Sequence, residues 1–209
     1  MFGVGATQGR GHTPMTEETP PGPDEALYGR LEALPPHQVG EIVGGRLIVS
    51  PRPASPHAAA SFALSVELGG PFQKGREGPG GWWFFTEPEL HLGADVLVPD
   101  LAGWRRSRMP VREPVPHFTQ APDWVCEVLS PSTARLDRTL KKQCYAREGV
   151  EYVWLVDPVL RTLEVLRLQQ GQWLERGAWS GGARVRAEPF DALELCLDAL
   201  WLSESSEPG

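Results

Sequence analysis

The sequence contains no apolar run that approaches the roughly 18 residues needed to cross a bilayer, so we expect no membrane-spanning helix. Its first 25 residues are rich in glycine and proline and have no apolar core, which excludes a secretory signal. The chain has only three cysteines, Cys126, Cys144 and Cys196, which are odd in number and far apart. This pattern does not predict disulfides or a cysteine metal site, and it favours a cytoplasmic protein.

Basic residues are also fewer than acidic residues, and the net charge is −7. This balance argues against a general nucleic-acid binder, although it allows a local basic face. Clustered cations occur at 104–108 and 135–147, where they are equally consistent with a solvated surface. The chain also lacks a Gly-x-Ser-x-Gly elbow and a Gly-x-x-x-x-Gly-Lys loop, which argues against a serine hydrolase and a P-loop nucleotide site.

The remaining pattern predicts one domain of mixed α/β (α+β) structure. We expect a disordered leader over 1–24, a single domain over 25–202 and a flexible tail over 203–209. The expected elements are a hairpin at 41–49 turned at Gly44-Gly45, a helix at 57–68 ending at Gly69-Gly70, strands at 82–85, 89–92, 96–102 and 124–129, a helix from Ser132 or Thr133 to Glu148, strands at 153–156, 162–168 and near 173, and weak helix at 190–202. This order predicts a mixed β-sheet flanked by helices.

One acid interrupts the most apolar of these strands. Glu127 lies within Trp124–Leu129, and both alternating faces of this run are otherwise apolar. Such a strand is normally buried on both sides, where a carboxylate must be paired, protonated or bound to a metal. Asp100 has a similar setting in the predicted strand at 96–102.

If these two strands are neighbours, about 4.8 Å apart, Asp100 and Glu127 can converge on one cation. Carboxylate oxygens suit a hard divalent ion, so we predict Mg²⁺, with Mn²⁺ as a substitute. Asp123 shares the parity of Glu127, but four strand residues separate the two by about 13 Å. We therefore interpret Asp123 as a residue that opens the strand and not as a ligand.

Lys141 follows on the next predicted helix, and two interpretations stay open. It lies four residues after Asp137, and such a pair stabilises an exposed helix by roughly 0.2–0.5 kcal/mol. Alternatively it leans over the two acids and orients or deprotonates a metal-bound water. We expect Leu136, Leu140 and Cys144 to form the buried stripe of this helix, with Lys141 at its border.

Several of these segments occur together in a recognisable order: Pro99-Asp100; Pro122-Asp123-Trp124-Val125-Cys126-Glu127-Val128-Leu129-Ser130-Pro131-Ser132-Thr133; Asp137 and Lys141; Tyr145-Ala146; Gly149-Val150; and Tyr152-Val153-Trp154-Leu155-Val156-Asp157-Pro158. With them, the chain resembles the Uma-two family of the PD-(D/E)XK, restriction-endonuclease-like superfamily. The likeness covers roughly residues 30 to 200.

The resemblance implies a restriction-endonuclease-like core with a metal held at its strand ends. It assigns Asp100 and Glu127 as catalytic and metal-binding acids and Lys141 as the catalytic lysine. The orthodox position of that lysine, two residues after the acid, is Leu129 here. Members often add an acid from an early element, and Glu41 is the candidate; its alternative is an exposed hairpin residue.

Three histidines receive no catalytic or metal role at this stage. His57 opens a predicted helix, where we expect a local cap or packing contact. His91 and His117 show no ligand spacing.

Two functions remain. The first is a metal-dependent endonuclease, a hydrolase that cleaves phosphodiester bonds in nucleic acid, with DNA as the expected substrate. The second is a catalytically silent nuclease-fold scaffold or regulatory partner. A homodimer is expected from the general frequency of dimers among oligomers.

Overall fold

The computed structural model describes residues 22–52, 54–109 and 114–202. Residues 1–21 of the predicted leader and the whole predicted tail, 203–209, lie outside the described residues. Within the described ranges, no helix has both the length and the apolar character needed to cross a membrane.

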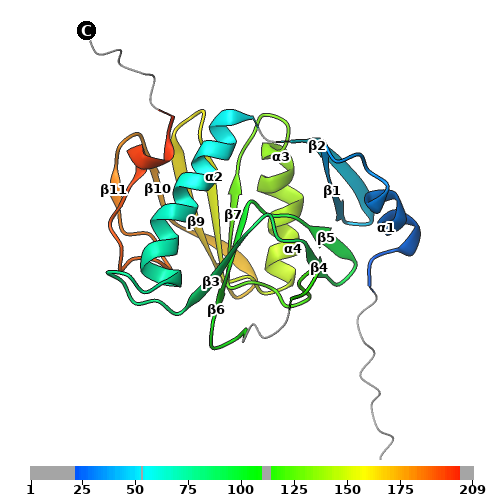
Figure 1. Cartoon of the computed structure of the whole chain (residues 1–209), viewed down its shortest axis with the longest axis horizontal. Helices are drawn as coiled ribbons and strands as arrows, with labels where there is room; N and C mark the ends of the chain where they lie inside the picture. The colour runs from blue at the N-terminus through cyan, green and yellow to red at the C-terminus, as the bar shows by residue number, and fades with distance from the viewer. Residues whose placement is uncertain (1–21, 53, 110–113, 203–209) are drawn as a thin grey trace, which may run out of the picture.

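A six-stranded mixed sheet forms the centre of the molecule, in the order β10-β9-β8-β7-β6-β3 (Figure 1). Its strands are β3 (Trp82–Thr86), β6 (Leu101–Arg105), β7 (Trp124–Val128), β8 (Tyr152–Asp157), β9 (Thr162–Gln169) and β10 (Gln172–Ser180). Neighbours are antiparallel except β7 and β8, which are parallel and are joined by a helical crossover. The predicted mixed sheet flanked by helices is therefore confirmed.

The two faces of this sheet carry separate apolar clusters because successive strand residues point in opposite directions. Trp124 and Trp154 lie on one face, where helix α2 (Ser55–Leu68) and segments from the C-terminal part of the domain cover them. Val125 and Leu155 lie on the other face, with Cys144 and Tyr145 of the crossover helix. Glu127 has the parity of Val125, so it points toward the crossover helix.

A second, four-stranded sheet has the order β2-β1-β5-β4. Its strands are β1 (Gln38–Val43), β2 (Arg46–Pro51), β4 (Leu90–Leu92) and β5 (Asp95–Leu97), preceded by helix α1 (Glu25–Glu32). The β1–β2 turn has positive φ at both Gly44 and Gly45, the backbone that a two-residue type I′ hairpin requires. The smaller elements are a π turn η1 (Gly69–Gln73), strands β11 (Arg184–Val185) and β12 (Leu195–Cys196), and a 3₁₀ turn η3 (Leu197–Leu200).

The single strand predicted at 96–102 is wrong. Residues 95–97 form β5 in the smaller sheet, and residues 101–105 form β6 in the central sheet. Between them lies Val98-Pro99-Asp100, and Pro99 cannot donate a backbone hydrogen bond to continue a ladder. Asp100 therefore lies at the point where the chain passes from one sheet to the other.

Two helix predictions also need correction. The helix at 57–68 does not stop at Gly69-Gly70, because Gly69 keeps a right-handed helical conformation and the chain continues into η1. The expected weak helix at 190–202 is a two-residue strand followed by η3.

The crossover helix consists of α3 (Ala134–Leu136), a π turn η2 (Asp137–Lys141) and α4 (Lys142–Arg147). The predicted buried stripe is wrong at Leu140, which is 39% exposed, and at Leu136, which is only half-buried. By contrast, Asp137 and Lys141 are 3% and 2% exposed. A π turn closes its hydrogen bonds over one more residue than an α-turn, so it rotates the following side chains relative to an ideal α-helix. Polar residues therefore occupy the inner face.

Asp95 joins three elements at the edge of β5. Its carboxylate accepts hydrogen bonds from Gly44 N at 2.7 Å, Arg147 Nη2 at 2.6 Å and Cys144 Sγ at 3.1 Å. Burial raises the pKa of Asp95, but the bonds from Arg147, Cys144 and Gly44 outweigh it and leave the pKa below its usual value.

We predict that Asp95→Asn lowers the free energy of unfolding at pH 7 by about 2 kcal/mol, because the neutral amide loses the charge-assisted hydrogen bond from Arg147. A carboxyl group whose pKa is lower in the folded state stabilises the protein at pH values above its unfolded-state pKa. This stabilisation is lost as the pH falls through the folded-state pKa. The difference between wild type and variant should therefore shrink below about pH 4. Urea unfolding across pH tests this, and a difference that does not change with pH would contradict it.

Candidate active site

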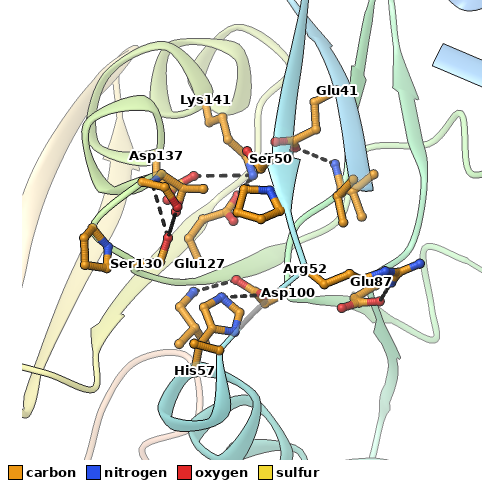
Figure 2. A pocket seen from close by; sticks show the side chains of 18 residues that line it. Glu41, Ser50, Arg52, His57, Glu87, Asp100, Glu127, Ser130, Asp137 and Lys141 are labelled. Carbon is orange, nitrogen blue, oxygen red and sulfur yellow. Dashed lines mark hydrogen bonds and ion pairs between the residues drawn. The ribbon is translucent and has the colours of Figure 1, made fainter. Parts of the chain in front are cut away.

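A pocket of about 270 Å³ lies where the two sheets separate (Figure 2). Strands β1 and β2, helix α2, the end of β7 and the crossover helix all contribute to its wall. The polar residues that line it are Glu41, Ser50, Arg52, His57, Glu87, Asp100, Glu127, Ser130, Ser132, Thr133, Asp137 and Lys141.

Glu127 lies at the buried end of β7 and is 3% exposed. Lys141 Nζ lies 2.9 Å from both of its carboxylate oxygens. The Tyr145 hydroxyl donates a further hydrogen bond to Oε1. These contacts satisfy the requirement that a carboxylate in an apolar strand be paired.

Lys141 is surrounded by carboxylates from three elements. Besides Glu127, its Nζ lies 2.9 Å from Glu41 on β1 and 3.5 Å from Asp137 one turn earlier. Glu41 also accepts a hydrogen bond from Val98 N at 2.8 Å, which anchors β1 to the chain just before Asp100. The interpretation of Asp137 and Lys141 as a pair on an exposed helix is therefore wrong.

Leu101 of β6 pairs with Cys126 of the antiparallel strand β7. Asp100 precedes Leu101 and Glu127 follows Cys126, so the two acids lie side by side at the same end of the two strands. Asp100 Oδ2 accepts a hydrogen bond from Val128 N at 2.7 Å. Its Oδ1 lies 3.1 Å from His57 Nε2, which approaches from α2 (Figure 2). Asp100 is thus held by the central sheet on one side and by α2 on the other.

Negative charge is in excess in this pocket, where five carboxylates face one lysine, one arginine and one histidine. Burial disfavours the Lys141 cation, but Glu127 and Glu41 outweigh it and hold the pKa of Lys141 well above its usual value. Burial raises the pKa of Glu127, and the negative charges of Asp137 and Asp100 raise it further. The positive charge of Lys141 lowers it only in part, so the pKa of Glu127 stays well above its usual value. Lys141 is therefore a protonated group that donates hydrogen bonds.

His57 responds to the same charge. Burial lowers its pKa, but the hydrogen bond and the charge of Asp100 outweigh that effect and raise it. Its other ring nitrogen, Nδ1, is buried and has no hydrogen-bond partner within the described residues.

The structure brings Asp100, Glu127, Lys141 and Glu41 together in one pocket. Glu41 is the fourth residue of β1 and is 6% exposed, so it neither opens the strand nor lies on an exposed hairpin surface. Asp123 does not line this pocket. It is buried beside Arg105 and Arg108, whose Nη1 atoms lie 2.7 and 2.8 Å from its Oδ1.

Sequence reasoning missed three residues of this constellation. Asp137 and Tyr145 lie four residues before and after Lys141, and this polar column at helical spacing was a usable signal. His57 was expected to make a local cap or packing contact, whereas it reaches Asp100, 43 positions away. No local pattern could have found that pair.

The donor set fits a hard divalent cation. Asp100 and Glu127 offer carboxylate oxygens on one wall, and both oxygens of Asp100 and Oε2 of Glu127 each retain a lone pair beyond the contacts described above. The excess of negative charge favours a cation at this position. Neither acid has a thiolate or a second imidazole beside it within the described lining, so softer metals gain no preferred ligand there.

Comparison with known proteins agrees with this geometry. Residues 26–199 match the Uma2 family, described as “Putative restriction endonuclease”. The chain belongs to the Uma2 family. It is also similar to a crystal structure from Anabaena variabilis ATCC 29413 described as “a putative nuclease belonging to DUF820”. That match has a TM-score of 0.68 and 26% sequence identity, and it covers 83% of this chain and 96% of the other. No curated protein matches the chain.

The Uma2 pocket leads to a prediction about Lys141. Replacing it with Met leaves buried carboxylates without their cation, so Lys141→Met should cost about 3–5 kcal/mol in the free energy of unfolding at pH 7. Because the folded-state pKa of Glu127 is raised, the folded state binds protons more readily, and the variant should gain stability as pH falls toward 5.

Lys142→Met is the matched control for chemical unfolding, since Lys142 is adjacent but does not line the pocket. We expect it to cost less than about 1 kcal/mol. Equal losses in the two variants would contradict the assignment of Lys141 as the counter-charge of the pocket.

Proposed function

We propose that this protein is a metal-dependent endonuclease that hydrolyses phosphodiester bonds in nucleic acid, with DNA as its substrate. The observation that carries the proposal is that Asp100 and Glu127 lie side by side at adjoining strand ends, with Lys141 held against Glu127. Membership of the Uma2 family, described as “Putative restriction endonuclease”, supports the same activity.

Asp100 and Glu127 would hold the ion, which would be Mg²⁺ with Mn²⁺ as a substitute. Such an ion supplies positive charge to a phosphate oxygen and lowers the pKa of a bound water. The geometry of the two acids is fixed by other parts of the chain. Val128 N and His57 hold Asp100, while Tyr145 and Lys141 hold Glu127.

Lys141 would act through its charge. Its raised pKa keeps it protonated, so it cannot accept the proton of an attacking water at neutral pH. A fixed ammonium can instead orient that water or stabilise the negative charge that develops on the phosphate. Glu41 and Asp137 would position Lys141 for this role.

The rim of the pocket offers groups that suit a phosphate backbone. Arg52 is exposed there and pairs with Glu87 at 3.6 Å, an exposed contact that costs little to break. The hydroxyls of Ser130, Ser132 and Thr133 lie together at the other side of the opening. Hydroxyl and guanidinium donors are common partners of phosphate oxygens.

The expected homodimer stays a prediction.

One observation favours the alternative, a catalytically silent scaffold. The pocket acids are already paired: Glu127 with Lys141 and Tyr145, and Asp100 with His57 and Val128. A network of this kind can be stable without an ion. Metal binding that is not accompanied by cleavage would favour this function.

The test is plasmid cleavage in Mg²⁺ or Mn²⁺ by wild type, Asp100→Asn and Glu127→Gln. We expect each substitution to lower the cleavage rate by at least about 100-fold, because it removes charge that the reaction requires. Circular dichroism should show that both variants keep the fold.

Asp123→Asn is the matched control, since Asp123 is a buried acid next to β7 but outside the pocket. The folded fraction of that variant should cleave at the wild-type rate. Full activity in Asp100→Asn or Glu127→Gln, or an equal loss in Asp123→Asn, would refute the site.

A further inference from the structure

A second group of metal-ligating side chains lies outside the pocket. Glu89, His91 and His117 each place a ligand atom within 4.8 Å of the other two. Among the described residues, no other group of three or more histidine, cysteine, aspartate or glutamate side chains meets that spacing. None of the three lines the pocket of Asp100 and Glu127.

Backbone contacts hold this cluster in place. The segment around Phe118 lies along β4, with His91 N donating to Phe118 O at 2.8 Å and Phe118 N donating to Glu89 O at 2.9 Å. His91 and His117 stack with ring centroids 3.7 Å apart and planes 7° apart. Sequence spacing could not reveal this pair, because 26 positions separate the two histidines.

Glu89 is oriented by its neighbours. Its Oε1 lies 2.6 Å from His91 Nε2 and accepts a hydrogen bond from the Tyr28 hydroxyl at 3.1 Å. The Tyr28 ring also meets His91 edge-on, with centroids 5.2 Å apart. A partner that holds a carboxylate ligand from outside is typical of protein metal sites.

We infer that Glu89, His91 and His117 form a Zn²⁺ site that is separate from the nuclease pocket. Two imidazoles and one carboxylate are a ligand set that Zn²⁺ uses with a water in the fourth position. Tetrahedral ligands about 2.1 Å from zinc lie about 3.4 Å from one another, whereas Glu89 Oε1 and His91 Nε2 lie 2.6 Å apart. Zinc binding therefore replaces that hydrogen bond and rotates the two stacked imidazoles out of their parallel arrangement, so that both ring nitrogens face the ion. Mg²⁺ prefers oxygen ligands and belongs at Asp100 and Glu127.

Such an ion would connect β4 to the segment that leads into β7. The site is half-buried rather than closed, which leaves the water position open to solvent. The inference does not depend on nuclease activity, because its ligands, its metal and its measurement are different.

The experiment is calorimetric titration of the metal-stripped full chain with Zn²⁺ in excess Mg²⁺, which occupies the oxygen ligands of the pocket. We expect one Zn²⁺ per chain and a rise in thermal stability that saturates at the same ratio. His91→Asn and His117→Asn should each weaken Zn²⁺ binding by more than about 100-fold, since outer partners alone are worth about 10- to 100-fold. Tyr28→Phe should weaken it by about 10-fold.

His37→Asn is the control, because His37 is exposed and outside the cluster, and it should bind Zn²⁺ as wild type does. Thermal unfolding without metal confirms that each variant is folded. Absence of Zn²⁺ binding by wild type would overturn the inference. So would binding that persists in both histidine variants, or binding that is lost in Asp100→Asn with Glu127→Gln instead.

Discussion

The buried ammonium of Lys141 among Glu127, Glu41 and Asp137 is the interaction on which the pocket depends. Taking such charges out of water costs several kcal/mol per ion, and attraction within the group offsets this only with good geometry. Apolar residues of similar volume would often stabilise a core as well or better. The group is therefore poor evidence for stability and better evidence for chemistry at this site.

The balance of charge explains how one pocket could accept both a cation and a phosphate. Five carboxylates exceed the charge of Lys141, Arg52 and His57, so the pocket alone would repel an anion. A divalent ion at Asp100 and Glu127, as the proposed function requires, would offset this excess, since it would add two positive charges close to the protonated Lys141.

Local sequence carries much of the fold and half of this site. Alternation identified the buried strand of Glu127 and its facing direction, and Gly44-Gly45 identified the β1–β2 turn. The residue pattern also identified Asp100 and offered Lys141 as a candidate, and the resemblance added Glu41. Sequence could not reveal the π turn that moves Asp137 and Lys141 inward, because hydrogen-bond register depends on tertiary packing. The contact of His57 with Asp100 joins α2 to the central sheet and has no local signature.

The mistaken strand at 96–102 shows why Asp100 can serve this pocket at all. On a continuous strand its direction would follow from the residues before it, and its carboxylate would be fixed by one sheet. Pro99 ends that ladder, β5 stays with β1, and β6 joins β7. Asp100 therefore takes its position from both sheets at once, through Val98 and Glu41 on one side and Val128 on the other. A shift of either sheet would move Asp100 relative to Glu127, so the packing of the two sheets sets the geometry of the acids.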